Sequence, residues 1–343
     1  MSTTTSRDLV IRTLNHEPVE RAPRDLWPSA VVEATRSDEL SEINIRYPSD
    51  IVYPEFKYPA GKRPSGKSSR EGQYTDAWGC TWQLSQQDTV SEVKSPPLAD
   101  PGKMAAFRPP LETLEASRFA RVNRSCENTS RFVLARTEIQ PFQRLQALRG
   151  KEAALADLAD DRQETRHLLA MLHEFFCREA ELWADTTVDG VALHDDWGSA
   201  DSLLVPPATW RELFRPLYRD YCKILHGKDK FVFFQSAGNI ADIFGELVRI
   251  GVDAVHADWF PMNIERLARR YRGRITFWGG LDRPEVLLRG APEEVRQAVQ
   301  RVRKALDFGA GGVIAQCPWE PEVPLRRIAI VFEQWMLPLP MHA

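Results

Sequence analysis

The sequence predicts a single (β/α)₈ barrel, and three observations lead to this fold class. From residue 131 onward, short apolar segments alternate with longer amphipathic segments, as expected for parallel strands that helices bury on both faces. The length of 343 residues suits a barrel, because such domains routinely exceed about 250 residues. A GxGxxG turn is missing, which argues against an open, doubly wound dinucleotide-binding sheet.

The expected elements follow in order along the chain. A short helix at 7–15 precedes residues 21–130, which are rich in Pro, Gly, Ser and charge and are expected to carry irregular or hairpin insertions over the barrel mouth. The expected strands cover residues 131–136, 189–195, 230–235, 251–257, 274–280 and 311–316. The expected helices cover residues 161–184, 207–226, 240–250, 262–271, 284–288, 292–308 and 324–336. Six strands here and one or two earlier ones complete a closed barrel, so residues 1–343 form one domain.

The charge and composition of the chain restrict the kinds of molecule that it is expected to bind. The net charge is −3, from 45 basic and 48 acidic residues, and no Lys/Arg run occurs, so neither nucleic acid nor an anionic membrane is expected to bind. The N-terminus lacks an apolar signal segment and no apolar run reaches about 18 residues, which predicts a cytoplasmic protein. The 5 cysteines are dispersed and include no CxxC pair, which argues against a disulfide scaffold or a zinc knuckle.

Polar and titratable residues recur where the expected strands end. In a parallel barrel, catalytic groups lie at this edge. The residues are His194, Asp195, Asp196, Gln235, His256, Asp258, Asp282, Cys317 and Glu320. A single aspartate at a strand end is more often a loop cap than a site, but several on one rim predict a pocket of acids and imidazoles.

The densest cluster is Asp195–Asp196–Trp197. Adjacent residues of an extended segment point to opposite sides, so we expect one carboxylate, Asp196, to face the mouth and the other to brace a neighbouring loop. A carboxylate buried beside tryptophan has a raised pKa, which suits a general acid. His256 is interpreted equally well as a catalytic or a packed histidine. The many tryptophans near the expected rim indicate a substrate with an apolar or aromatic portion.

Segments along nearly the whole chain resemble the uroporphyrinogen decarboxylase superfamily, which includes corrinoid- and coenzyme M-linked methyltransferases. The segments, in the family's order, are RTLNHEPVERAPRDLW, YPSDIV, YTDAWGCTW, PFQRLQALRGKEAALADL, HDDWG, FFQSAGNIADIF, ITFWGGLD and CPWEPEVPLRRI. The resemblance implies the barrel fold over the whole chain. It also implies that Asp50, within YPSDIV, corresponds to the catalytic aspartate of the decarboxylase.

The sequence departs from both branches of this superfamily. The decarboxylases carry an Arg-rich loop after the first strand that holds substrate carboxylates, whereas this chain has DLWPSAVVEATR there, with Arg21 and Arg24 only before it. The methyltransferases bind zinc through a His-x-Cys-Gly motif and a later Cys or His. Here Gln235 and Ala237 replace the first two ligands and only Cys317 fits the third, so the usual zinc site is expected to be lost.

Three functions remain open at this point. The first is methyl transfer to or from a small O- or N-methylated compound, with zinc at an altered site or no metal, and with a corrinoid or corrinoid protein supplied in trans. The second is metal-free decarboxylation or lyase cleavage. The third is a non-catalytic binding subunit. Methyl transfer ranks first because DDWG, GNI and WGGLD look more like that branch. The segment 21–130 is either a lid or the surface of a homodimer.

These functions share one set of candidate residues. Proton transfer is assigned to Asp50, Asp196 and His256. Substrate contacts are assigned to His194, Asp195, Trp197, Gln235, Asp282 and Glu320. An altered metal site would draw on His194, His256, Asp195 or Asp196, Glu320 and Cys317.

Overall fold

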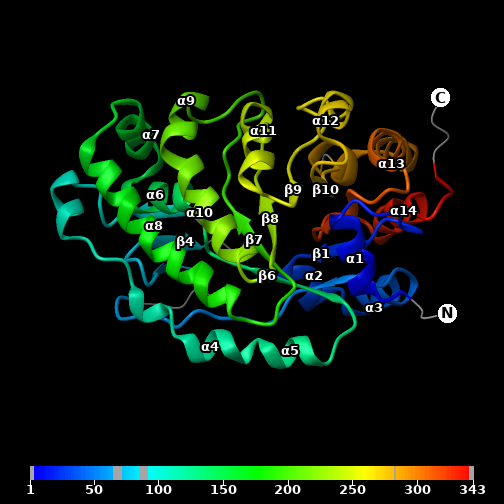
Figure 1. Ribbon diagram of the computed structural model, residues 1–343, viewed down its shortest axis with the longest axis horizontal. Coiled ribbons are helices and arrows are strands. Elements are labelled where there is room, and N and C mark those ends of the chain that lie inside the picture. The colour runs from blue at the N-terminus through cyan, green and yellow to red at the C-terminus, as the bar shows by residue number, and fades with distance from the viewer. Residues whose placement is uncertain (1–3, 65–71, 85–91, 282, 340–343) are drawn as a thin grey trace.

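A computed structural model describes residues 4–64, 72–84, 92–281 and 283–339, and its core is an eight-stranded parallel sheet that curves into a barrel (Figure 1). The strand order is β1-β11-β10-β9-β8-β7-β6-β2. Six strands come from the regular part of the sequence: β6 (Phe132–Arg136), β7 (Gly190–His194), β8 (Phe231–Gln235), β9 (Ala254–His256), β10 (Thr276–Trp278) and β11 (Val313–Trp319). The other two, β1 (Arg24–Pro28) and β2 (Ile51–Val52), lie in the N-terminal third. The predicted barrel is therefore confirmed.

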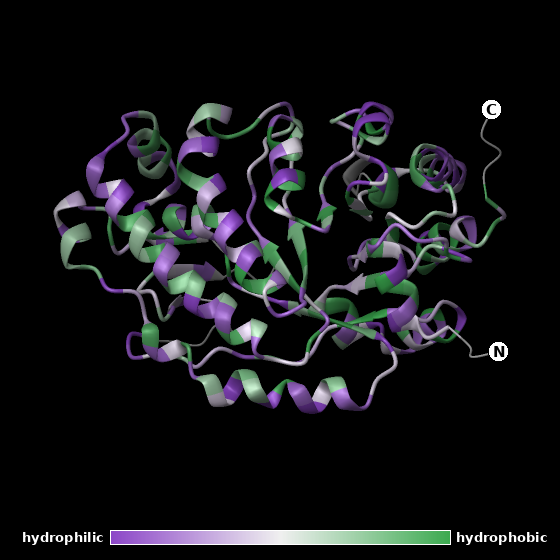
Figure 2. Ribbon diagram, in the orientation of Figure 1, coloured by the Kyte–Doolittle hydropathy of each residue, from purple (hydrophilic) through white to green (hydrophobic). Residues whose placement is uncertain are grey.

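Side chains of opposite phase along each strand form two separate cores. Leu134, Ala192, Phe233 and Ile314 belong to an inner core, which α1 (Ser6–Leu14) closes with Val10 and Leu14. The residues between them belong to a larger outer core under the helices. The strands are accordingly hydrophobic along most of their length, while the helices carry hydrophilic outer faces (Figure 2).

Helices and helical turns surround the sheet. The α-helices are α2 (Ala30–Thr35), α3 (Ser37–Arg46), α4 (Ala116–Arg121), α5 (Asn123–Glu127), α6 (Pro141–Arg149), α7 (Lys151–Ala159), α8 (Gln163–Ala184), α9 (Pro207–Thr209), α10 (Arg215–His226), α11 (Ala241–Ile250), α12 (Ile264–Tyr271), α13 (Pro292–Leu306) and α14 (Leu325–Trp335). The 3₁₀ turns are η1 (Pro101–Ala106) and η2 (Leu111–Thr113), and the π-helical turns are η3 (Trp210–Phe214) and η4 (Arg283–Arg289). The helix expected at 207–226 is thus interrupted by a π turn. Within the described ranges, none of the helices has the length and apolar content needed to cross a bilayer.

The two end strands of the sheet meet at their amino ends. The Asp50 amide donates to the Arg24 carbonyl over 2.8 Å, and the Arg24 amide donates to Asp50 Oδ2 over 2.7 Å. Ser49 Oγ also donates to the Arg24 carbonyl, over 3.2 Å. These bonds connect β1 to the chain just before β2, where the strand order shows no ladder between β1 and β2.

An antiparallel sheet of β3 (Gly72–Thr75), β4 (Thr81–Leu84) and β5 (Glu92–Ser95) forms the insertion after β2. It lies against α6 and α8: the Trp78 ring packs edge-on against Phe175, with 4.6 Å between ring centroids, and the Leu98 amide donates to the Leu148 carbonyl over 2.9 Å. The segment 21–130 thus carries an antiparallel insertion, as expected, and it also supplies β1 and β2, the two earlier strands that complete the barrel. The insertion lies beside the loop that follows β6.

Candidate active site

Strand alternation places one set of polar side chains on the inner face at the carboxyl end of the barrel. Arg136, His194, Gln235 and His256 each lie two residues beyond an inner-core residue of the same strand. The same rule adds Tyr53 after Ile51 and Gln316 after Ile314, and Trp278 is itself an inner-core residue. We call the following set the mouth ring: Asp25, Trp27, Tyr53, Arg136, His194, Gln235, His256, Trp278 and Gln316.

His194 is the acid of the mouth ring, because its contact with Asp196 favours the protonated imidazolium. Its Nε2 lies 3.3 Å from Asp196 Oδ1. Burial lowers the pKa of His194, but the hydrogen bond to Asp196 and the charge of that carboxylate outweigh it, so the net pKa is raised. Asp196 is fixed in turn, because it accepts from the Gln143 side chain over 3.0 Å and from the Ala237 amide over 2.7 Å. Burial works to raise the pKa of Asp196, yet His194 and these donors lower it overall.

His256 has the opposite character. Burial lowers its pKa, and this effect outweighs the favourable hydrogen bond to Trp278. The Nδ1 atom lies 2.8 Å from the Trp278 carbonyl oxygen, which can only accept, so Nδ1 carries the proton in the neutral ring. The bare nitrogen is therefore Nε2, which makes neutral His256 a base.

The strand register spaces these two imidazoles for a substrate. His194 of β7 is opposite Gln235 of β8, and Gln235 is opposite His256 of β9. Two strand spacings of about 4.8 Å each separate the histidine backbones. An acid and a base thus lie on one inner face with an amide between them, and their surroundings shift the two pKa values apart.

Three aromatic rings of the mouth ring are oriented by one buried carboxylate. Asp25 Oδ2 accepts from Trp27 Nε1 over 2.8 Å, from the Tyr53 hydroxyl over 2.7 Å and from Trp278 Nε1 over 2.8 Å. Burial raises the pKa of Asp25, and the hydrogen bonds only partly oppose it. The Arg136 guanidinium lies 3.9 Å from the Tyr53 ring centroid and 5.1 Å from that of Trp27. The rings thus form an apolar wall beside a cation.

Below this wall, buried polar atoms lack partners. Asp25 Oδ1 and both polar atoms of the Gln316 amide have no hydrogen-bond partner among the described residues. The two residues are register partners on β1 and β11. Gly279, with φ +66°, gives Gln316 its space, because a Cβ there would lie 2.1 Å from Oε1. An unpaired buried polar group costs about 1–3 kcal/mol, so a hydrogen-bonding partner at these atoms would stabilise the site.

Asp50 does not belong to this site, so the proton-transfer role assigned to it beside Asp196 and His256 is corrected. It precedes β2 and therefore lies at the amino end of the barrel, whereas the mouth ring lies at the carboxyl end. Its carboxylate accepts from Arg21 over 2.6 and 2.8 Å and from Ser6 Oγ over 2.7 Å. Burial raises the pKa of Asp50, but Arg21 and the other donors lower it overall. The residue fastens the N-terminal segment to the strand ends.

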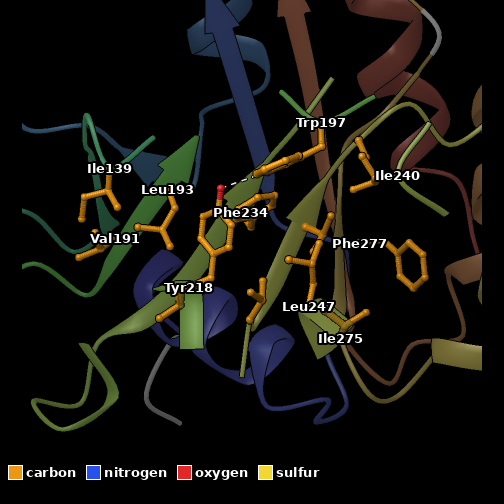
Figure 3. Packing of buried hydrophobic residues seen from close by; sticks show 14 of the residues in the cluster. Ile139, Val191, Leu193, Trp197, Tyr218, Phe234, Ile240, Leu247, Ile275 and Phe277 are labelled. Atoms are coloured by element: carbon orange, nitrogen blue, oxygen red, sulfur yellow. Dashed lines mark hydrogen bonds between the residues drawn. The ribbon is translucent and has the colours of Figure 1, made fainter. Parts of the chain in front are cut away.

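Asp195 and Trp197 face the outer core, so their expected substrate contacts are also wrong. Asp195 accepts from the amides of Phe142, over 2.8 Å, and Gln143, over 2.7 Å, in the first turn of α6, and from the Tyr218 hydroxyl. Burial raises its pKa to about 7, so the raised pKa expected for this pair falls on Asp195 rather than Asp196. Trp197 stacks on Phe142 with 4.0 Å between ring centroids. It also donates to the Tyr218 hydroxyl over 3.1 Å (Figure 3). As expected, one carboxylate serves the mouth and the other braces a loop.

The residues present do not fit the zinc site that the resemblance implies. Cys317 lies one residue beyond inward-facing Gln316, so its thiol points into the outer core, where burial raises its pKa. Gln235 offers a weak amide ligand and Ala237 offers none. In the described part of the chain, His, Cys, Asp and Glu side chains do not gather in threes at metal-binding distances. The altered metal site is therefore not assembled there either.

The structure says less about two further candidate residues, Glu320 and Asp282. Glu320 lies just beyond β11 and is half-buried. Asp282 lies outside the described residues. Trp278 is one of the tryptophans that the sequence placed near the rim, whereas the members of the mouth ring that the sequence did not single out are Asp25, Trp27, Tyr53, Arg136 and Gln316. Most of these residues lie within strands, whereas the sequence-based candidates were sought among residues that follow strands. They could have been found by counting every second residue along each strand from a residue of the inner core.

The chain was compared with known proteins. The profile of the family described as uroporphyrinogen decarboxylase (URO-D) matches residues 75–334. A methyltransferase from Methanosarcina mazei has a TM-score of 0.73 at 14% identity, over 97% of this chain and 98% of that one. A glycosylated endo-β-1,4-xylanase from Gloeophyllum trabeum has a TM-score of 0.48 at 9% identity, over 97% and 99% of the two chains. No curated protein sequence matches. Because the profile covers well over half of the sequence, the chain belongs to the uroporphyrinogen decarboxylase family.

Proposed function

We propose that the chain is an enzyme that cleaves a small carboxylate-bearing molecule, by decarboxylation or a related lyase reaction, through acid–base catalysis in the mouth ring. The observation that carries the proposal is a pair of imidazoles with different partners on one inner face of the barrel. His194 lies 3.3 Å from the Asp196 carboxylate, which raises its pKa, and His256 lies 2.8 Å from the Trp278 carbonyl oxygen, where burial lowers its pKa. Membership of the decarboxylase family supports this reaction class. A pure binding subunit has no need of two imidazoles tuned in opposite directions.

The residues divide the chemistry as follows. In a decarboxylation, the bond to the substrate carboxylate breaks, carbon dioxide leaves, and the electron pair left on the substrate takes a proton. The His194 imidazolium supplies that proton and is restored from solvent, while Asp196 holds it in position. His256 accepts a proton from a substrate hydroxyl or amine through Nε2 while the carbon–carbon bond breaks, and returns it to the same group of the product.

Substrate recognition follows from the wall and the cation. Trp27, Tyr53 and Trp278 suit an aromatic or apolar body. Arg136 is exposed and, among the described residues, forms no ion pair, so its guanidinium is available for a second anionic group. The unpartnered atoms of Asp25 and Gln316 supply a further polar contact.

The test is release of carbon dioxide from a panel of hydroxylated benzoates and phenylacetates. We expect turnover of at least one of them, and a loss of about 10²- to 10⁴-fold in kcat for His194→Gln and His256→Gln. The matched control is His167→Gln, because His167 is exposed on α8, and it should react like the wild type. Equal rates in His194→Gln and the wild type would overturn the assignment.

Methyl transfer is the second candidate. It is favoured by the methyltransferase neighbour and by a mouth acid that can protonate the oxygen or nitrogen from which a methyl group leaves. It would need a corrinoid acceptor, free or on a partner protein, since zinc chemistry at the usual site does not fit. Enzyme-dependent methylation of cob(I)alamin by methoxylated members of the panel, followed by absorbance, would favour this reaction over decarboxylation.

A further inference from the structure

A cavity of about 600 Å³ lies beside the barrel mouth, between the insertion sheet and helices α6 and α8. Its lining includes Tyr58, Tyr74, Asp76, Trp82, Glu138 and Glu179, together with Arg144 and Trp78, and it includes no residue of the mouth ring. We name these eight residues the flank pocket. We propose that the flank pocket binds a small organic cation, such as a quaternary or primary ammonium group, at a site separate from the mouth ring.

The charge balance of the flank pocket favours a cation. Its three carboxylates are Asp76, Glu138 and Glu179, and Arg144 is the one basic side chain in its described lining. Arg144 already pairs with Asp76 over 3.4 Å and with Glu138 over 3.0 Å. Among the described residues, no Lys, Arg or His forms an ion pair with Glu179. An anion would meet net repulsion here.

Glu179 is the residue that most needs a partner. It is 0% exposed and lines the cavity. Its Oε1 accepts from the Tyr58 hydroxyl and, over 3.2 Å, from the Glu138 amide. Its Oε2 accepts no hydrogen bond of ordinary geometry among the described residues, and burial raises the pKa of Glu179 to about 7 even though the Tyr58 hydroxyl and the Trp183 side chain act to lower it. A buried carboxylate with one unsatisfied oxygen is strongly stabilised by a cation that donates to it or lies against it.

Aromatic side chains form a large part of the remaining lining of the cavity, and this favours an organic cation over a metal ion. Tyr58, Tyr74, Trp78 and Trp82 present rings to the cavity but no metal ligands. The Arg144 guanidinium already lies 4.6 Å from the Trp78 ring centroid, so the same wall holds one organic cation in cation–π geometry. Trp82 is held in place by its Nε1, which donates to Asp76 Oδ2 over 2.8 Å. A volume of this size is typical of a small-molecule site.

Titration of the full-length protein with choline tests the proposal. Its neutral isostere 3,3-dimethylbutan-1-ol has the same shape without the charge and serves as the matched probe. We expect saturable choline binding by calorimetry and by tryptophan fluorescence, with the isostere binding at least tenfold more weakly. Glu179→Gln and Trp82→Leu should each weaken choline binding at least tenfold.

The His194→Gln variant separates this site from the mouth ring and should bind choline like the wild type. Loss of binding in that variant would place choline in the mouth and overturn the proposal, as would the absence of saturable binding or equal affinity for the isostere. If Glu179→Gln does not fold by circular dichroism, Trp82→Leu and Glu138→Gln carry the test, because both residues are less buried.

Discussion

At the scale of single residues, the atom that a histidine ring contacts decides what the residue can do. His194 and His256 both lie on the inner face of the barrel, and burial pushes the pKa of each downward. A carboxylate at 3.3 Å reverses the effect for His194, whereas a carbonyl oxygen at 2.8 Å fails to reverse it for His256. A full charge stabilises an imidazolium more than a carbonyl dipole does.

Substitution of Asp196 should therefore lower the pKa of His194 while the imidazole itself stays unchanged. In Asp196→Asn we expect the pKa of His194 to fall below 6.5, because burial then acts without its opposing charge. Activity that requires protonated His194 should be lost at lower pH than in the wild type, so the basic limb of the kcat/KM profile shifts to lower pH.

Proton NMR titration of the ring signals measures the shift directly. The control is His226, which pairs with Asp253 at the opposite end of the barrel and should titrate as in the wild type. A His194 pKa that stays raised in Asp196→Asn would contradict the assignment.

Two residues that the sequence assigned to the mouth lie one position away from the residues that face it. Asp195 and Cys317 were each assigned to the mouth, but each is the outward neighbour of an inward residue, His194 or Gln316. A shift of one residue in strand phase moves a side chain from the inner to the outer core. For Cys317 the residue type was noticed but the strand phase was not, whereas for Asp195 the alternation was applied but a substrate contact was still assigned.

At the scale of elements, aspartates at the amino ends of strands connect neighbouring segments. Asp189 accepts from the Val133 amide over 2.7 Å, and Asp253 accepts from the Val232 amide over 2.7 Å. Asp50 does the same for Arg24 at the junction of β1 and β2, where the strand order ends. Its ion pair with Arg21 adds a second link between the two segments.

We predict that Asp50→Asn destabilises the fold by about 3 kcal/mol, because it leaves the Arg21 charge without its buried partner. The folded-state pKa of Asp50 is depressed, so its contribution is present above the unfolded pKa of about 3.9 and is lost as the pH falls through the folded value. The variant should therefore lose stability at neutral pH but differ less from the wild type in acid.

Urea denaturation at several pH values measures the difference. Where the folded fraction is equal, kcat should match the wild type, since the hydrogen bonds of the Asp50 carboxylate go to Ser6, Arg21 and the Arg24 amide and to no side chain of the mouth ring. A large loss of kcat with unchanged stability would instead support the catalytic role that the family resemblance implied.

At the scale of the whole molecule, the sheet separates an inner core, which ends in the mouth ring, from an outer core that contributes no side chain to the mouth ring. Cys317 belongs to the outer core and is 0% exposed. Cys317 lies within β11, where the sequence alone suggests a metal ligand. The sheet lies between its thiol and the mouth ring, which is why Cys317 does not face the residues with which it would have to share a zinc ion.

We expect a thiol reagent such as DTNB to leave Cys317 unmodified in the native protein and to label it on unfolding in urea, because burial keeps the thiol protonated and out of reach. Purified protein should bind less than one zinc per chain, and Cys317→Ser should leave that content unchanged. Rapid native labelling of Cys317, identified by mass spectrometry, or one tightly bound zinc per chain that this variant loses would contradict the placement.

The sequence by itself determined the fold class, the family and six of the eight strands, because each depends on local patterns that survive without tertiary contacts. It also identified His194, Gln235 and His256, since these polar residues end apolar strands. Only the tertiary structure decided which neighbour of each pair faces inward, that Asp50 lies at the amino end, and that Asp25, Arg136 and Gln316 join the site. Strand pairing fixes phase and direction for all strands together, and no single segment carries that information.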